Sequence, residues 1–211
     1  DRSGPIRVAV IGPLLFSQLL PKALRELQSV YPTARYAVNW VDRLQIEEAV
    51  ANQRADVGVT LGPVDNPALG VEDLATVEAI AVFEAGHPLA QLAEISVDDL
   101  GQLPLILPQR QTRLRQLADS GLLKAAHPLS VQVETSTAVT SCHMASAGLG
   151  IALSDPFSVT GVDPKLVEVR PWRPKISMTY AFIWPASRPP TERLRRLMLA
   201  IRNQIEAACI T

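Results

Sequence analysis

Long apolar runs are missing from this sequence, and so is any excess of charge of one sign. No stretch approaches the roughly 18 consecutive apolar residues that a membrane-spanning helix needs, and no charged and then apolar leader opens the chain. The 20 basic and 21 acidic residues leave a net charge of -1. Because binding to a phosphate backbone needs a clustered positive field, this balance argues against DNA binding by this chain itself, and we expect no membrane partner.

Cysteine is scarce and histidine is scattered. The two cysteines, Cys142 and Cys209, lack CxxC spacing, which is typical of a reducing cytoplasm rather than of a disulfide scaffold. The histidines at 87, 127 and 143 lie far apart in the sequence, so we expect no metal site. Cys142 and His143 invite a nucleophile-base interpretation, but adjacent helix residues point about 100° apart and do not face each other.

Signatures of catalysis and of cofactor binding are also absent. The chain has no GxSxG, no P-loop, no HExxH and no GxGxxG after a strand. The Gly148-Leu149-Gly150 turn precedes a strand, whereas a dinucleotide fingerprint would open a helix. We therefore expect no cofactor and no enzymatic activity. The enzyme alternative is a transferase or a dehydratase. Either would need a set of catalytic residues that the sequence does not offer.

Apolar, β-branched runs alternate with helical patterns, which predicts an α/β fold with largely parallel sheets. The order β-α-β-α-β occurs once before residue 100 and once after it. The expected strands cover 6–11, 35–40, 56–61, 105–107, 130–134 and 151–153. Helical spacing of apolar residues covers 20–31, 46–53, 112–123 and 137–147.

Two further strands and a last helix organise these repeats into two lobes. Extended segments at 77–84 and 177–184 would cross between the lobes, and the amphipathic helix 191–208 would return to the first. The prediction is two Rossmann-like lobes, lobe I at 5–82 plus 185–211 and lobe II at 83–184, joined as a hinged clamp. Ligands of open α/β sheets bind outside the carboxyl ends of the strands, so the expected site is the cleft between the lobes.

The segment Ala145–Pro156 carries the most local information. It predicts a helix exit, a two-glycine turn and a buried strand that ends at a proline. Gly148 would take the left-handed conformation at the helix exit, and Gly150 would let helix and strand pack closely.

Five segments, taken together, resemble the effector-binding domain of LysR-type transcriptional regulators. The resemblance lies in their order and spacing and covers nearly the whole chain. The segments are Arg7–Gly12, Leu19–Pro21 with Tyr31-Pro32, Ala55–Val59, Gly86–Ala90 and Ala145–Pro156.

This resemblance implies a clamp like that of type 2 periplasmic-binding proteins, acting in the cytoplasm as a ligand sensor. It also implies homodimers, homotetramers in the full-length protein, and an N-terminal winged helix-turn-helix that is absent from this chain and alone contacts DNA. The start at Asp1-Arg2-Ser3-Gly4-Pro5 fits such a cut, since a strand is expected almost at once.

In lobe I the resemblance places the effector at the starts of the first two helices. Pro13, Leu14, Leu15 and Phe16 follow the first strand, where the family commonly has a serine or threonine after the glycine. Pro13 lacks a hydroxyl and an N–H, which indicates a partly apolar wall; the alternative is that the three apolar residues pack between helix and sheet.

Asp42 and Arg43 follow the second strand. Arg43 would pair bidentately with an effector carboxylate, or the two residues form an exposed charge pair at a helix start that Asp42 caps.

In lobe II the corresponding segment is Gln109, Arg110 and Thr112. Arg110 is the best cation candidate there; the alternative is that it is simply solvated, as the neighbouring Arg113 and Arg115 look from the sequence.

Ser136 and Thr137 supply hydroxyls at the next helix start, where either is also a natural N-cap. Glu78, on the first crossing strand, would meet an effector's amino group or an arginine across the cleft, or would face water.

These residues would suit a small carboxylate-type effector: an organic acid, an aromatic acid or an amino-acid derivative. The leading hypothesis is therefore the ligand-sensing and oligomerising domain of a LysR-type regulator. The alternative is a secreted solute-binding protein of a transporter, which would use the same clamp.

Overall fold

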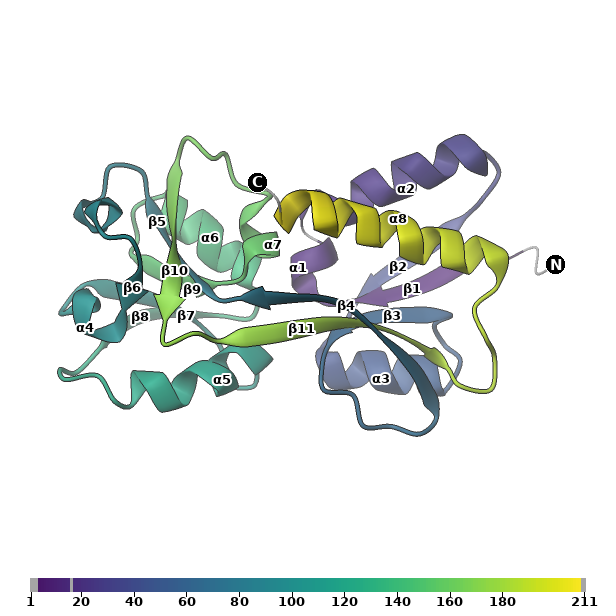
Figure 1. Cartoon of the computed structure of the whole chain (residues 1–211), viewed down its shortest axis with the longest axis horizontal. Coiled ribbons are helices and arrows are strands. Elements are labelled where there is room, and N and C mark those ends of the chain that lie inside the picture. The colour runs from purple at the N-terminus through teal and green to yellow at the C-terminus, as the bar shows by residue number, and fades with distance from the viewer. Residues whose placement is uncertain (1–3, 16, 210–211) are drawn as a thin grey trace. The chain divides into compact units, whose positions relative to one another are not determined.

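The structure, a computed structural model, describes residues 4–15 and 17–209, apart from the side chains of Leu15 and Cys209 (Figure 1). The chain forms two compact units: unit 1 holds residues 1–76 and 179–211, and unit 2 holds 77–178. The chain passes between the units within strands β4 (Leu69–Glu78) and β11 (Ser177–Pro185).

These boundaries lie earlier in the chain than the predicted ones, after residue 76 rather than 82 and after 178 rather than 184. The first difference follows from strand β5 (Ile80–Glu84), which pairs along its length with two strands of the second unit and so lies wholly in that unit. The second follows from β11, whose residues 180–183 pair with a strand of the first unit.

Unit 1 is built on a five-stranded sheet with the order β2-β1-β3-β11-β4. Strands β1 (Ile6–Val10), β2 (Tyr36–Trp40) and β3 (Val57–Leu61) run parallel, and β11 runs antiparallel to β3. The helices of this unit are α1 (Gly12–Leu15), α2 (Leu19–Val30), α3 (Arg43–Ala51) and α8 (Glu192–Cys209). Helices α2 and α8 lie against each other on one face of the sheet, and α3 covers the other face (Figure 1).

The apolar face predicted for the last helix is largely the one that the structure buries. In α8 the apolar residues at three- and four-residue spacing are buried: Leu194, Leu197, Met198, Ile201 and Ile205. Helix α2 ends at Val30, because the residue before Pro32 is disfavoured in helical conformation.

Unit 2 is built on a six-stranded sheet with the order β6-β10-β5-β9-β7-β8. Its further strands are β6 (Ile95–Ser96), β7 (Pro104–Pro108), β8 (Ser130–Thr135), β9 (Ile151–Ser154) and β10 (Val167–Arg173). Strand β7 runs parallel to both β8 and β9, whereas β5 runs antiparallel to its neighbours β9 and β10. The helices are the 3₁₀ helix η1 (Pro88–Gln91), α4 (Val97–Leu100), α5 (Arg113–Leu122), α6 (Ala138–Ser146) and α7 (Pro156–Val159).

The two glycines before β9 have separate tasks. Gly148 has a φ of +78°, which confirms the left-handed conformation predicted at the helix exit. A Cβ atom at Gly150 would collide with the carbonyl oxygen of Pro104 at the start of β7. The close approach at Gly150 is therefore between the backbones of two neighbouring strands, and the expected close packing of helix and strand at this glycine was wrong.

Candidate functional site

Parallel strands β7, β8 and β9 bring their carboxyl ends to one edge of the second sheet. We call the ends of these strands and the residues that follow them, 108–112, 135–137 and 155–156, the carboxyl edge of unit 2. The Gln109 N–H donates to the carbonyl oxygen of Thr135 at 2.8 Å, so the first two segments are in contact. Gln109, Arg110, Thr112, Ser136 and Thr137 thus belong to one surface, as predicted from the strand order.

Two threonines of this edge are helix caps. The Thr137 hydroxyl accepts from the Thr140 N–H at 3.2 Å, which confirms it as the N-cap of α6. The Thr112 hydroxyl accepts from the Arg115 N–H at 3.4 Å and donates to the Gln109 carbonyl at 2.7 Å. Ser136 is exposed beside Thr137 and is not the cap.

Arg115 is buried, so its assignment as a solvated residue was wrong. Only 5% of the residue is exposed, because its guanidinium lies among acceptors on three elements. Nε donates to Asp119 Oδ1 at 2.7 Å, and Nη1 donates to Glu134 Oε1 at 2.7 Å and to the Pro108 carbonyl at 3.1 Å. Burial opposes the charged form, but these two carboxylates offset it and raise the pKa of Arg115. Arg115 thereby ties α5 to the ends of β7 and β8.

Arg110 differs from Arg115 in its exposure and in its partners. It is exposed at the end of the segment after β7. Among the residues that the structure describes, none accepts a hydrogen bond from it or forms an ion pair with it. Gln109, next to it, has its side-chain oxygen bonded to Gln111 Nε2 at 2.8 Å. Arg110 is thus a cation at this edge that an anionic ligand can reach.

Glu78 has partners within its own unit. Its Oε1 lies 2.9 Å from Lys175 Nζ, and its Oε2 lies 4.0 Å from Arg173 Nη1. The carboxylate therefore sits in a partly exposed cluster of charges at the end of β4. This engagement weakens its candidacy as the partner of an effector's amino group.

In unit 1, the end of β3 and the segments after β1, β2 and β3 form the corresponding carboxyl edge of unit 1: residues 11–15, 41–43 and 61–63. Arg43 Nε donates to the Leu61 carbonyl at 2.8 Å and Nη2 donates to the Pro63 carbonyl at 2.6 Å. Nη2 also lies 3.3 Å from Glu47 Oε1. The Arg43 guanidinium therefore joins the start of α3 to the segment after β3. Asp42 precedes α3 and forms a capping box with Gln45, which confirms its predicted cap role.

The apolar segment of unit 1 is described only in part. Leu14 is 1% exposed and so belongs to the core, as the packing alternative expected. Pro13 is half-buried in α1. The side chain of Leu15 and the whole of Phe16 lie outside the described residues.

Cys142 is unsuited to thiol chemistry. It is fully buried in the core of unit 2, with Sγ 3.1 Å from Ser154 Oγ. Burial raises the pKa of Cys142 to about 12, so the reactive thiolate is not formed near neutral pH. Within the described part of the chain, no group of three or more His, Cys, Asp or Glu residues could hold a metal ion. None of the described helices has the length and apolarity that crossing a bilayer requires.

Two α/β units, linked by two strands and carrying polar helix starts at their carboxyl edges, define a ligand-binding domain of the periplasmic-binding-protein-like class. The sequence matches the family model of the LysR substrate binding domain over residues 1–206. The chain therefore belongs to the LysR substrate-binding domain family, as its motifs indicated.

Solved structures share the fold. The reduced form of the OxyR regulatory domain from Pseudomonas aeruginosa has a TM-score of 0.79 at 22% identity, over 95% of this chain and 96% of that one. The BenM effector-binding domain with its effector benzoate has a TM-score of 0.76 at 19% identity, over 100% of this chain and 96% of that one. At these identities the likeness shows the fold alone.

A curated relative is the transcriptional activator protein LysR of Escherichia coli K12, 28% identical over 190 residues. The match covers 89% of this chain and 60% of that protein, so the chain spans about three-fifths of the relative's length. The matched relatives are transcriptional regulators and not enzymes, which agrees with the expectation drawn from the sequence. The matches do not favour the solute-binding alternative.

Proposed function

We propose that this chain senses a small carboxylate effector for a LysR-type regulator, and that Arg110 receives the carboxylate. The observation that carries the proposal is the exposed Arg110 guanidinium, which has no partner among the described residues. A guanidinium binds a carboxylate through charge-assisted, often bidentate, hydrogen bonds. The exposed Ser136 hydroxyl on the adjoining segment offers a further donor.

The other candidates narrow the effector class. Arg43 is bonded to two carbonyls and Glu47, and Glu78 is bonded to Lys175, so a second ion pair with the ligand is not prepared at either residue. This favours an organic or aromatic acid over an amino-acid derivative. The BenM domain, whose structure holds benzoate, offers a precedent for an aromatic acid on this fold.

In the full-length protein we propose an N-terminal winged helix-turn-helix that alone contacts DNA, in homodimers and homotetramers acting in the cytoplasm. Relatives that extend beyond the matched region and act as transcriptional activators support this proposal. The effector would then act by shifting a conformational population, and it can do so only by its difference in affinity for the two states.

The test is a thermal-shift screen of this chain against aromatic acids, aliphatic dicarboxylates and amino acids in separate sets. A ligand at about 100 times its Kd stabilises the native state by roughly 2.7 kcal/mol, or several degrees for a domain of this size. We expect the stabilising acid to lose its effect in Arg110→Ala and to keep it in Arg25→Ala, which removes an exposed arginine of α2. Stabilisation that survives Arg110→Ala would refute this site.

A further inference from the structure

Unit 1 contains a cavity at the edge of its sheet opposite to the carboxyl edge. The cavity has a volume of about 1090 Å³ and lies where β1 begins and where the chain enters β3. The segment that leads from β11 into α8, residues 185–194, forms its remaining wall. All of its lining residues belong to unit 1, and none of them belongs to the carboxyl edge of unit 1.

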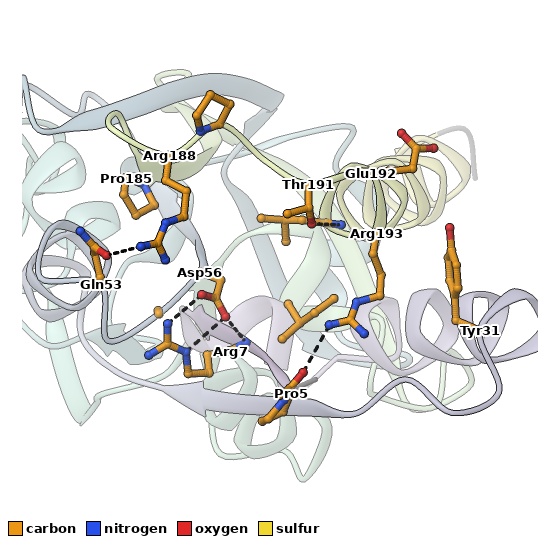
Figure 2. A pocket seen from close by; sticks show the side chains of 15 residues that line it. Pro5, Arg7, Tyr31, Gln53, Asp56, Pro185, Arg188, Thr191, Glu192 and Arg193 are labelled. Carbon is orange, nitrogen blue, oxygen red and sulfur yellow. Dashed lines mark hydrogen bonds and ion pairs between the residues drawn. The ribbon is translucent and has the colours of Figure 1, made fainter. Parts of the chain in front are cut away.

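Three arginines line this cavity, and among the described residues a carboxylate pairs with Arg7 alone. Arg7 donates to Asp56 from its backbone N–H at 2.9 Å, from Nε at 3.2 Å and from Nη2 at 2.7 Å (Figure 2). The hydrogen bond to Asp56 raises the pKa of Arg7. The charge of Arg7 is thus neutralised by Asp56, since Nε and Nη2 each donate to a carboxylate oxygen of that residue.

Among the described residues, Arg188 and Arg193 have only neutral acceptors. Arg188 Nη2 donates to Gln53 Oε1 at 2.7 Å, and Arg193 Nη2 donates to the Gly4 carbonyl at 3.3 Å. Figure 2 shows the two side chains extending from opposite sides of the cavity, with the Arg7–Asp56 pair between them and nearer to Arg188. Across the described part of the chain, no carboxylate lies within ion-pair distance of either guanidinium.

The one further acid of the lining does not change this balance. Glu192 is exposed, and its Oε1 accepts from Arg196 Nε at 3.0 Å. Two half-buried positive charges of the lining therefore have no counter-charge within the described part of the chain. Because a guanidinium that is partly removed from water gains most from an anionic partner, the cavity favours an anion with more than one charged group.

Apolar side chains close the rest of the cavity. Tyr31 stands beside Arg193 in Figure 2, and Leu194 and Pro185 are buried in the wall. A ligand here would place its charged groups on Arg188 and Arg193 and its carbon skeleton against these residues.

We propose that this cavity is a second ligand site, which binds a small molecule carrying at least two carboxylate or phosphate groups. It is independent of the effector site proposed at Arg110. The Arg7–Asp56 pair forms its floor, and Arg188 and Arg193 are the residues that hold the anion.

The test is titration of the chain with citrate and, separately, with pyrophosphate, followed by backbone amide NMR at a constant ionic strength of about 0.15 M. We expect saturable shifts at residues 53–56 and 185–194. The double variant Arg188→Ala/Arg193→Ala should weaken binding by about tenfold or more, because both charge-assisted contacts are lost. Tighter binding of citrate would assign the site to polycarboxylates, and tighter binding of pyrophosphate would assign it to phosphate compounds.

The matched control is Arg25→Ala/Arg195→Ala, which removes two exposed arginines outside the cavity and changes the net charge equally. It should bind both anions as the unmodified chain does, and so should Arg110→Ala, whose effect is confined to the effector proposal. If the double variant does not fold, Arg188→Ala and Arg193→Ala should each weaken binding by about threefold or more. Equal weakening in both double variants, or no saturable shift at 185–194 at millimolar anion, would overturn the proposal.

Discussion

The carboxyl edges of the two units use arginine in different ways. At the edge of unit 1, Arg43 is bonded to the carbonyls of Leu61 and Pro63 and so holds the chain after β3. At the edge of unit 2, the buried Arg115 does the corresponding work, and Arg110 is left exposed without a partner among the described residues. The difference shows that the position of an arginine at a helix start does not decide its role. The carbonyls and carboxylates within its reach decide it.

The acids of the two edges differ in burial as the arginines do, with the buried one in unit 2. Asp42 in unit 1 is exposed at the start of α3. Asp155 in unit 2 is 2% exposed and accepts from the N–H groups of Phe157 and Ser158 and from the Ser158 hydroxyl. Unit 2 therefore stabilises its edge with buried charged groups, and this leaves its exposed polar groups available to a ligand.

The largest effect expected from this comparison is that of Arg115→Ala. The substitution removes three hydrogen bonds from a buried guanidinium and separates α5 from the ends of β7 and β8. Breaking a buried charge network by removing one member typically costs about 3 kcal/mol. We expect a loss of that size in the free energy of unfolding, measured by urea denaturation.

Two variants sharpen this measurement. Arg115→Lys keeps the charge but lacks the fork that reaches two carboxylates, so it should recover only part of the stability. Gln116→Ala, at an exposed neighbour on the same helix, should stay within about 0.5 kcal/mol of the unmodified chain. If Arg115→Ala were as stable as Gln116→Ala, the guanidinium would not brace this edge.

A smaller loss is expected for Arg43→Ala in unit 1. The Arg43 side chain is 32% exposed, and the substitution removes its hydrogen bonds to the carbonyls of Leu61, at the end of β3, and of Pro63, so we expect about 1–2 kcal/mol. Amide hydrogen exchange in α3 and β3 would measure this loss of stability locally.

Arg54→Ala is the matched control, because Arg54 pairs with Glu48 and both side chains are 62% exposed. Exposed pairs contribute little, about 0–1 kcal/mol. A loss in Arg43→Ala no larger than that in Arg54→Ala would contradict the structural role of Arg43.

Much of the fold followed from the sequence, because apolar spacing is set by the sheet and helix faces that are buried. The repeated β-α-β-α-β order, the second crossing strand and the apolar face of α8 were predicted from that spacing. The first crossing strand was wrong: it was placed at 77–84, whereas the chain crosses within β4 and residues 80–84 form β5 of unit 2. Strand β10 was not predicted, because charged side chains and Pro171 interrupt its apolar positions. Helices α4 and α7, of four residues each, are too short to show a periodic pattern.

The candidate site was less predictable, for a physical reason. The sequence placed Arg110 and Arg115 on one segment, but it could not show which guanidinium would find carboxylates. Glu134 comes from the next strand and lies 19 positions away in the chain, and the strand pairing alone brings it to Arg115. The spacing of Arg115 and Asp119 at i and i+4 was the one local signal that could have identified the pair.

The smallest effect on stability is expected for Arg110→Ala. A small effect would distinguish Arg110, proposed to bind a ligand, from the arginines that stabilise the fold. Since no described residue pairs with Arg110, its removal should change the free energy of unfolding by less than about 0.5 kcal/mol. A urea denaturation curve that overlays that of the unmodified chain would show that Arg110 does not contribute to the stability of the fold. A loss of 1 kcal/mol or more would instead place Arg110 with Arg43 and Arg115 as a residue that holds its own edge. With an unchanged curve, any loss of effector binding in Arg110→Ala is assignable to the missing guanidinium and not to a disturbed loop.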